Sequence, residues 1–124
     1  MSDLKPNTEA RRSPFPDDVT ERGVRAFLKR IGENYPVRAV FLFGSRARGT
    51  HQADSDADLA VVLDGDNAER SHVSGEMAEI AFDILMETGL LVQAVPLWES
   101  EWRDPERFPN PTLIASIRRD GVRL

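Results

Sequence analysis

Apolar residues recur at helical spacing in three segments of the chain, with polar residues at the positions between them. The clearest case follows Asp18-Val-Thr-Glu21, which fits a helix-capping box, because apolar residues then return at i, i+3, i+4 and i+7. The three segments cover residues 18–31, 67–88 and 113–120, and each is followed by a glycine that suits a helix end: Gly32, Gly89 and Gly121. The pattern therefore predicts three helices.

Three other segments are short, apolar and rich in β-branched or aromatic residues, which is typical of buried strands. They cover residues 37–43, 58–63 and 90–97, and the first is bounded by Pro36 and Gly44. The order is helix, strand, strand, helix, strand, helix, with no internal repeat. We therefore expect an α/β (α+β) fold, in which a small mixed sheet carries helices packed mainly on one face.

Length and charge limit how the chain is organised. Its 124 residues carry 16 Lys and Arg against 21 Asp and Glu, a formal charge of −5, and this length supports one domain with one core. The first 16 positions hold three of the eight prolines and little apolar content, so they bury too little to order themselves. We predict a flexible tail over residues 1–17 and a single domain over residues 18–124.

The composition also excludes several classes of protein. No apolar run approaches the ~20 residues that span a bilayer, and the N-terminus lacks the apolar core of a secretory signal, so we expect a cytoplasmic protein without membrane contact. The chain has no cysteine, which leaves carboxylates and two histidines as candidate metal ligands. Its acidic balance argues against a broad nucleic-acid-binding surface, because such surfaces neutralise phosphates with Lys and Arg.

Candidate chemistry lies between the first two predicted strands. Gly44-Ser45 follows the first strand, where a glycine lets backbone N–H groups approach a phosphate and the serine hydroxyl adds a donor. Asp56 and Asp58 open the second strand two residues apart, so both carboxylates point to the same face. Two carboxylates on one face suit Mg²⁺, which could bridge triphosphate oxygens in phosphoryl or nucleotidyl transfer.

A phosphate-binding P-loop is the alternative interpretation of this stretch. Gly44 to Thr50 has the glycine spacing of the P-loop pattern, but the lysine that reaches the β- and γ-phosphates is missing. The chain is also short for that fold. We therefore set the P-loop aside.

The stretch resembles the signature of a known family. Gly44-Ser45, ten intervening residues, and Asp56-Ala-Asp58 followed by an apolar strand look like the motif of the minimal nucleotidyltransferases, small members of the DNA polymerase beta-like superfamily. The resemblance covers residues 20–98 and implies a nucleotidyltransferase fold, Mg²⁺ on the two aspartates, and ATP phosphates near Gly44 and Ser45. Arg46 and Arg48 lie where this family often carries basic residues, which makes them candidates for contacts with the nucleotide or a partner.

The same resemblance implies a partner. Stand-alone proteins of this size look like the antitoxins of two-gene bacterial modules, in which the toxin is a helical HEPN-type ribonuclease. Some antitoxins of the family transfer AMP from ATP onto a tyrosine of the toxin, a reaction called AMPylation. We therefore expect a Mg²⁺-dependent nucleotidyltransferase that acts as an antitoxin on such a partner.

One position departs from the family pattern. Active members of the superfamily usually supply a third carboxylate from the later strand, whereas Gln93 is the only polar side chain of segment 90–97. We expect Gln93 to be buried, hydrogen-bonded and facing the cleft of Asp56 and Asp58. Glutamine is a weak, neutral metal ligand. Either two carboxylates suffice for catalysis, or the chain is a weak or inactive binding module that neutralises a toxin by contact.

The remaining conspicuous residues have ordinary interpretations beside functional ones. His51 fits a surface loop, although it could touch a phosphate, and His72 fits a solvated or structural position on the second helix. An exposed partner patch is one interpretation of Trp98, Trp102 and Phe108, and packing within the domain is the other.

Overall fold

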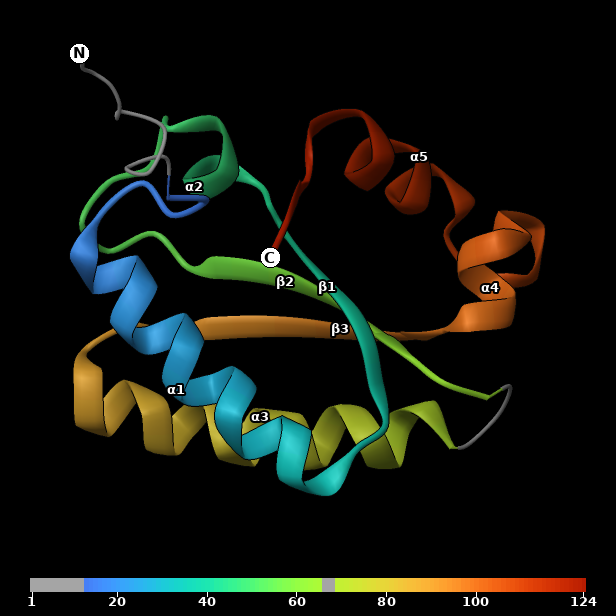
Figure 1. Ribbon diagram of the computed structural model, residues 1–124, viewed down its shortest axis with the longest axis horizontal. Helices are drawn as coiled ribbons and strands as arrows, with labels where there is room; N and C mark the ends of the chain where they lie inside the picture. Colours follow the sequence, from blue (N-terminus) through green and yellow to red (C-terminus); the bar gives the residue numbers. More distant parts are fainter. Residues whose placement is uncertain (1–12, 66–68) are drawn as a thin grey trace, which may run out of the picture.

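The computed structural model describes residues 13–65 and 69–124, and Figure 1 shows a sheet between two groups of helices. All three predicted helices and all three predicted strands are present. The elements follow in the order α1 (Asp18–Asn34), β1 (Val37–Phe43), α2 (Ser45–Arg48), β2 (Ala57–Leu63), α3 (Arg70–Thr88), β3 (Val92–Trp98), α4 (Glu99–Arg103), the 3₁₀ helix η2 (Pro105–Arg107), α5 (Pro111–Asp120) and β4 (Val122–Arg123).

The strands form one mixed sheet in the order β3-β2-β1-β4. Strand β1 pairs antiparallel with β2 and with the two-residue strand β4, whereas β2 and β3 run parallel. The parallel pair needs a long crossover, and α3 supplies it. This arrangement confirms the prediction of a small mixed sheet in an α/β fold.

The two long helices, α1 and α3, cover one face of the sheet, as expected (Figure 1). Side chains of β2 alternate between the two faces: Leu59, Val61 and Leu63 join the core under α1 and α3, and Ala60 and Val62 face the other way. On that second face, buried residues of α5 and the connection before it form a smaller core: Phe108, Ile114 and Ile117. The shorter C-terminal helices therefore cover part of the face that the sequence left open.

Helix α1 differs from the prediction at both ends. Asp17, not Asp18, is the N-cap, because its Oδ1 accepts a 2.9 Å hydrogen bond from the backbone N–H of Thr20. The helix runs through Gly32 to Asn34. A glycine inside a helix costs only about 1 kcal/mol relative to alanine, and the fully buried Ile31 beside it holds this part of the helix against the core.

The turn from α3 into β3 positions the third strand. Gly89 has a φ of 81°, which confirms it as the residue that ends α3. The Thr88 hydroxyl then accepts a hydrogen bond from the N–H of Leu90. Helix α1 packs directly on this turn, because a side chain at Gly23 would place its Cβ 2.5 Å from a methyl carbon of Leu90.

Two residues of the predicted tail contact the domain. Phe15 is half-buried and packs against the main core, and the Arg25 guanidinium lies 5.3 Å from its ring centre. Asp17 caps α1 and lies 2.7 Å from His51 Nε2. Residues 1–12 of the predicted tail, and the predicted start of the second helix at Asn67, lie outside the described residues.

The aromatic residues near the C-terminus pack within the domain. Trp98 and Phe108 are buried, and the Trp102 ring stacks on Phe41 of β1 with 4.7 Å between ring centres. Of the two interpretations of these residues, internal packing is the one observed. In the parts of the chain that the structure describes, no helix combines the length and apolar character needed to cross a bilayer.

Candidate functional site

Gly44 lies in direct contact with one of the candidate carboxylates. Strand β1 ends at Phe43, which is paired with Asp58 of β2. Gly44 follows with a φ of 75°, and a Cβ built on it would lie 2.3 Å from Oδ2 of Asp58. Both the backbone angle and the close approach require a glycine here. The turn after β1 and the first residues of β2 therefore form one site.

Ser45 opens the four-residue helix α2 beside that contact. The N–H groups of Ala47 and Arg48 donate to the carbonyl of Gly44, each at 3.1 Å, and Gly49 ends the helix in the left-handed conformation. These bonds fix the turn, so the half-buried Ser45 hydroxyl stays at the end of β1. The anion cradle at Gly44 and Ser45 stays a prediction.

Asp56 and Asp58 form a pair of carboxylates whose negative charge the described chain does not neutralise by contact. No hydrogen bond or ion pair joins either carboxylate to another described residue. Burial raises the pKa of Asp58 above its ordinary value, the nearby charge of Asp56 raises it further, and Arg48 opposes both effects. The pair thus carries an electrostatic cost that a bound cation would relieve.

This donor set fits Mg²⁺. Two carboxylates supply hard oxygen ligands, and Mg²⁺ in nucleotide sites is typically held by one or two carboxylates together with substrate phosphates. Among the described residues, no group of three His, Cys, Asp or Glu side chains could hold a metal. The site offers Asp56 and Asp58 and no third carboxylate, in agreement with the departure seen in the sequence.

Gln93 lies where the sequence placed it, but in a different environment. The parallel register pairs Gln93 of β3 with Asp58 of β2, so the two side chains share a face of the sheet. The side chain of Gln93 is exposed, and no hydrogen bond to another described residue holds it. The expectation of a buried, hydrogen-bonded amide was wrong, because β3 is an edge strand and this end of it is open to solvent.

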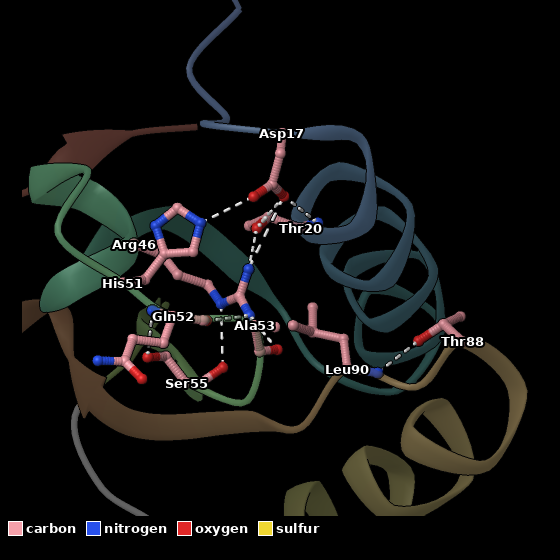
Figure 2. Close-up of polar contacts among 9 residues, drawn as sticks. All are labelled: Asp17, Thr20, Arg46, His51, Gln52, Ala53, Ser55, Thr88 and Leu90. Atoms are coloured by element: carbon pink, nitrogen blue, oxygen red, sulfur yellow. Dashed lines mark hydrogen bonds and ion pairs between the residues drawn. The ribbon is translucent and has the colours of Figure 1, made fainter.

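The two arginines of α2 have different surroundings. Arg48 is exposed and close enough to Asp58 to lower its pKa, which suits a cation beside bound phosphates. Arg46 is only 2% exposed, and its donors go to the protein itself (Figure 2). This differs from the expectation that Arg46 contacts nucleotide or a partner, because its guanidinium donors bond to residues of the loop and of α1.

A polar network around Arg46 was not foreseen. The Arg46 guanidinium donates to the Thr20 hydroxyl at 2.6 Å, and that hydroxyl donates to Asp17 Oδ1 at 2.7 Å. His51 Nε2 lies 2.7 Å from the other oxygen of Asp17, so His51 is mostly buried against α1. Its Nδ1 has no hydrogen-bond partner among the described residues. The contact between Arg46 and Thr20 joins residues 26 positions apart, and the contact between His51 and Asp17 joins residues 34 positions apart. No local sequence pattern connects such pairs.

His72 matches its ordinary interpretation. Its side chain is exposed on α3, and Nε2 lies 3.4 Å from a carboxylate oxygen of Glu76, one helical turn away. It lies outside the candidate site.

The comparison with known families connects this geometry to an activity. The sequence matches the family described as the nucleotidyltransferase domain over residues 24–120, which is most of the chain and includes the whole candidate site. The chain belongs to this nucleotidyltransferase family. In this nucleotidyltransferase, Gly44 of the Gly-Ser turn contacts Asp58, the second of the paired aspartates.

Two solved structures align with the chain to different degrees. One is a toxin-antitoxin with AMP-PNP, which aligns with a TM-score of 0.58 and 21% identity over 83% of this chain and 70% of that chain. A candidate nucleotidyltransferase from Sulfolobus solfataricus aligns with a TM-score of 0.44 and 20% identity over 85% of this chain and 84% of that chain. No curated protein matches the sequence. At these identities, the first likeness shows a common fold.

Proposed function

We propose that this nucleotidyltransferase transfers AMP from ATP onto an acceptor hydroxyl in a Mg²⁺-dependent reaction. The single observation that carries this proposal is the contact between Gly44 and Asp58. It joins a turn suited to phosphate with a pair of carboxylates suited to a divalent cation. A nucleoside triphosphate bound with Mg²⁺ is the ligand that needs both at once.

Asp56 and Asp58 would hold the ion. When bound, Mg²⁺ would neutralise charge on the triphosphate and stabilise the charge that develops in transfer. Gly44 would let the backbone approach the phosphates, the Ser45 hydroxyl would donate to a phosphate oxygen, and Arg48 would add a positive charge beside them. In the transfer, the acceptor oxygen bonds to the α-phosphorus. The bond between the α-phosphorus and the oxygen that bridges it to the β-phosphorus breaks, and pyrophosphate leaves. The acceptor proton passes to water.

We propose further that the acceptor is a tyrosine of a small helical HEPN-type toxin, and that the chain is its antitoxin in the cytoplasm. Two points support this: the motif resembles that of antitoxin-type minimal nucleotidyltransferases, and the fold is shared with a toxin-antitoxin with AMP-PNP.

The test uses the protein encoded by the neighbouring gene. Purified toxin is incubated with this chain, Mg²⁺ and ATP labelled at the α-phosphate, and the toxin is then analysed by intact-mass and peptide-mass spectrometry. We expect label and the mass of AMP on a tyrosine, and we expect neither with EDTA nor with the Asp56→Asn, Asp58→Asn double variant. Label on RNA or a small molecule instead would remove the toxin as acceptor and keep the transferase.

A second candidate function is supported by one observation. Asp58 faces the neutral Gln93 on β3, so the ion would lack a third carboxylate. The alternative is a binding module that neutralises a toxin by contact. In that case the double variant would still form the complex and still suppress the toxin's ribonuclease activity, and neither ATP nor Mg²⁺ would be needed.

A further inference from the structure

Arg46 lies between the two halves of the candidate site. It directly follows Ser45, and Ser55 directly precedes Asp56. On the basis of the proposed metal site, we propose that Arg46 is a positioning residue, whose buried guanidinium sets the place of Asp56 relative to Ser45 and thereby the affinity of the carboxylate pair for a divalent cation.

One side chain holds the whole segment that leads into Asp56. Arg46 Nε donates to the carbonyl of Ser55 at 3.0 Å, and Nη2 donates to the carbonyls of Ala53 at 3.2 Å and Gln52 at 3.4 Å (Figure 2). The Ser55 carbonyl belongs to the peptide bond that joins Ser55 to Asp56. The residue after the Gly-Ser turn therefore fixes the backbone immediately before the first carboxylate.

The same guanidinium ties this segment to helix α1. Nη1 donates to the Thr20 hydroxyl, which in turn donates to Asp17, and the Asp17 carboxylate lies 3.7 Å from Nη1 (Figure 2). Thr20 is fully buried, and α1 is a 17-residue helix packed on the sheet. The loop thus takes its position from a rigid element of the core.

The burial of Arg46 makes it costly for the loop to move. Arg46 is 2% exposed, and a charge at that depth is tolerated only when its donors are satisfied. If residues 52–55 moved, three carbonyl acceptors would be lost and the guanidinium would remain buried without them. Moving the loop is therefore costly, and Asp56 stays in one place.

The geometry is specific to arginine. The planar guanidinium presents N–H groups in a fixed fork, and here that fork reaches the carbonyls on one side and Thr20 on the other. A lysine would keep the positive charge but offer one ammonium group, which cannot occupy both places. Arg46→Lys therefore keeps the positive charge but removes the forked set of hydrogen bonds.

Other contacts between the two halves lie at the ends of the loop. Thr50 N–H donates to the Ser45 carbonyl at 3.0 Å, and Phe43 pairs with Asp58. Within the loop, the hydrogen bonds are short-range, from Gln52 N–H to Ser55 Oγ and from Ser55 N–H to the Gln52 carbonyl. Among the described residues, Arg46 is the side chain of α2 that bonds to residues 52–55.

The experiment measures cation binding and folding on the full chain. Mg²⁺ is titrated calorimetrically into the wild type and Arg46→Lys, with Mn²⁺ binding followed by electron paramagnetic resonance as a second probe, and the melting temperature of each protein is recorded. We expect Arg46→Lys to bind the ion about 10-fold more weakly, the size typical of a residue that positions a metal ligand. In the transfer reaction, the fold decrease in kcat should be larger than the fold increase in the KM for ATP.

Arg70 provides a matched control at the other end of the sheet. It is a partly buried arginine that, like Arg46, donates to the protein itself: to the Pro96 carbonyl at 2.9 Å and to the Glu101 carboxylate. Arg70→Lys should lower the melting temperature while leaving the affinity for Mg²⁺ unchanged. A general loss of stability would move both variants together, whereas a positioning role moves the affinity of Arg46→Lys alone.

The outcomes are distinguishable. Wild-type affinity in folded Arg46→Lys, or equal weakening in Arg70→Lys, overturns the positioning role and leaves the proposed function intact. A wild type that binds neither ion overturns the proposed metal site and this inference with it. If Arg46→Lys does not fold, Thr20→Val replaces it, because it removes one acceptor of the guanidinium and keeps the arginine; a few-fold loss of affinity there supports the proposal, and no loss overturns it.

Discussion

Two carboxylates, Asp17 at the start of α1 and Asp58 near the start of β2, have opposite electrostatic surroundings. Hydrogen bonds from the Thr20 side chain and backbone, with a further contribution from His51, lower the pKa of Asp17 to about 2. Burial and the neighbouring Asp56 instead raise the pKa of Asp58. The Asp17 side chain is more exposed than that of its partner His51, yet both of its carboxylate oxygens contact groups of the protein.

The difference separates structure from function in this chain. The charge of Asp17 has partners within the fold: Thr20, His51 and the buried Arg46. The charge of Asp56 instead raises the pKa of Asp58, and among the described residues Arg48 opposes this effect. A protein that keeps two such carboxylates together accepts a cost to its stability, which a cation can offset. The first region holds the loop, and the second region is where we propose that a cation binds.

The largest effect is expected from removing the charges of the second region. Asp56→Asn and Asp58→Asn should each lower the rate of transfer at least ~100-fold, because each loses a ligand of the ion that stabilises the transition state. Initial rates with ATP labelled at the α-phosphate measure the loss. Asp64→Asn, at the opposite end of β2, is the control and should keep wild-type activity; full activity in both site variants would refute their catalytic role.

A smaller gain is expected from adding charge to the second region. Gln93→Asp should tighten Mg²⁺ binding about 10-fold and speed transfer, because it places a third carboxylate on the face of Asp58. Calorimetric titration of Mg²⁺ measures the affinity. Gln93→Asn has the same size without the charge and should not change it. Unchanged affinity in Gln93→Asp would show that position 93 does not reach the ion.

A still smaller effect is expected at the phosphate turn. Ser45→Ala should raise the KM for ATP about 5-fold, equivalent to about 1 kcal/mol for a lost hydrogen bond, and should change kcat less. A donor to a non-reacting phosphate oxygen binds the ground state and the transition state about equally. Steady-state kinetics separates the two constants, and a defect confined to kcat would instead place Ser45 at the reacting centre.

The smallest effects concern stability, and the charges of Asp17 and Asp58 should change the stability of the fold with pH in opposite directions. The pKa of Asp17 is about 2 in the folded protein against an ordinary 3.8, so its charge stabilises the fold above pH 4, and this contribution is lost as the pH falls towards 2. The raised pKa of Asp58 has the opposite consequence, because the folded state resists its ionisation and loses stability as the pH rises above 3.8.

Urea unfolding in EDTA at pH 3 and pH 7 checks both signs. At pH 7, Asp17→Asn should lower the free energy of unfolding, and Asp58→Asn should leave it unchanged or raise it. Each change should stay below about 1 kcal/mol, because solvent screens partly exposed charges. Asn keeps the N-cap at position 17, so the comparison isolates the charge. Added Mg²⁺ should stabilise the wild type and not Asp58→Asn; an identical response in both would contradict the metal site.

Much of the fold follows from local patterns. The periodicity of residues 18–31 and 67–88, and the β-branched strands 37–43 and 58–63, predict the elements because each reflects burial on a helix face or in a sheet. The ends of the helices depend less on local patterns than the elements themselves do. Gly89 ends its helix, whereas Gly32 does not, since packing of the neighbouring Ile31 outweighs the weak preference of glycine.

The candidate site divides in the same way. Gly44-Ser45 and Asp56-Ala-Asp58 could be found from the sequence because their chemistry depends on residue type and on spacing over a short stretch. The role of Arg46 could not. Two arginines two residues apart look alike in the sequence, and only tertiary structure turns Arg46 towards Thr20 and leaves Arg48 beside Asp58.

The sequence by itself therefore determined the three predicted helices, the three predicted strands, the motif and the missing third carboxylate, because these depend on residue identity and local periodicity. Only the tertiary structure decided that Asp17 and His51 support the loop, that Gly44 touches Asp58, and that Gln93 is exposed beside it. Those facts depend on which strand lies at the edge of the sheet and on contacts between residues far apart in the chain, where burial and partner geometry set each side chain's role.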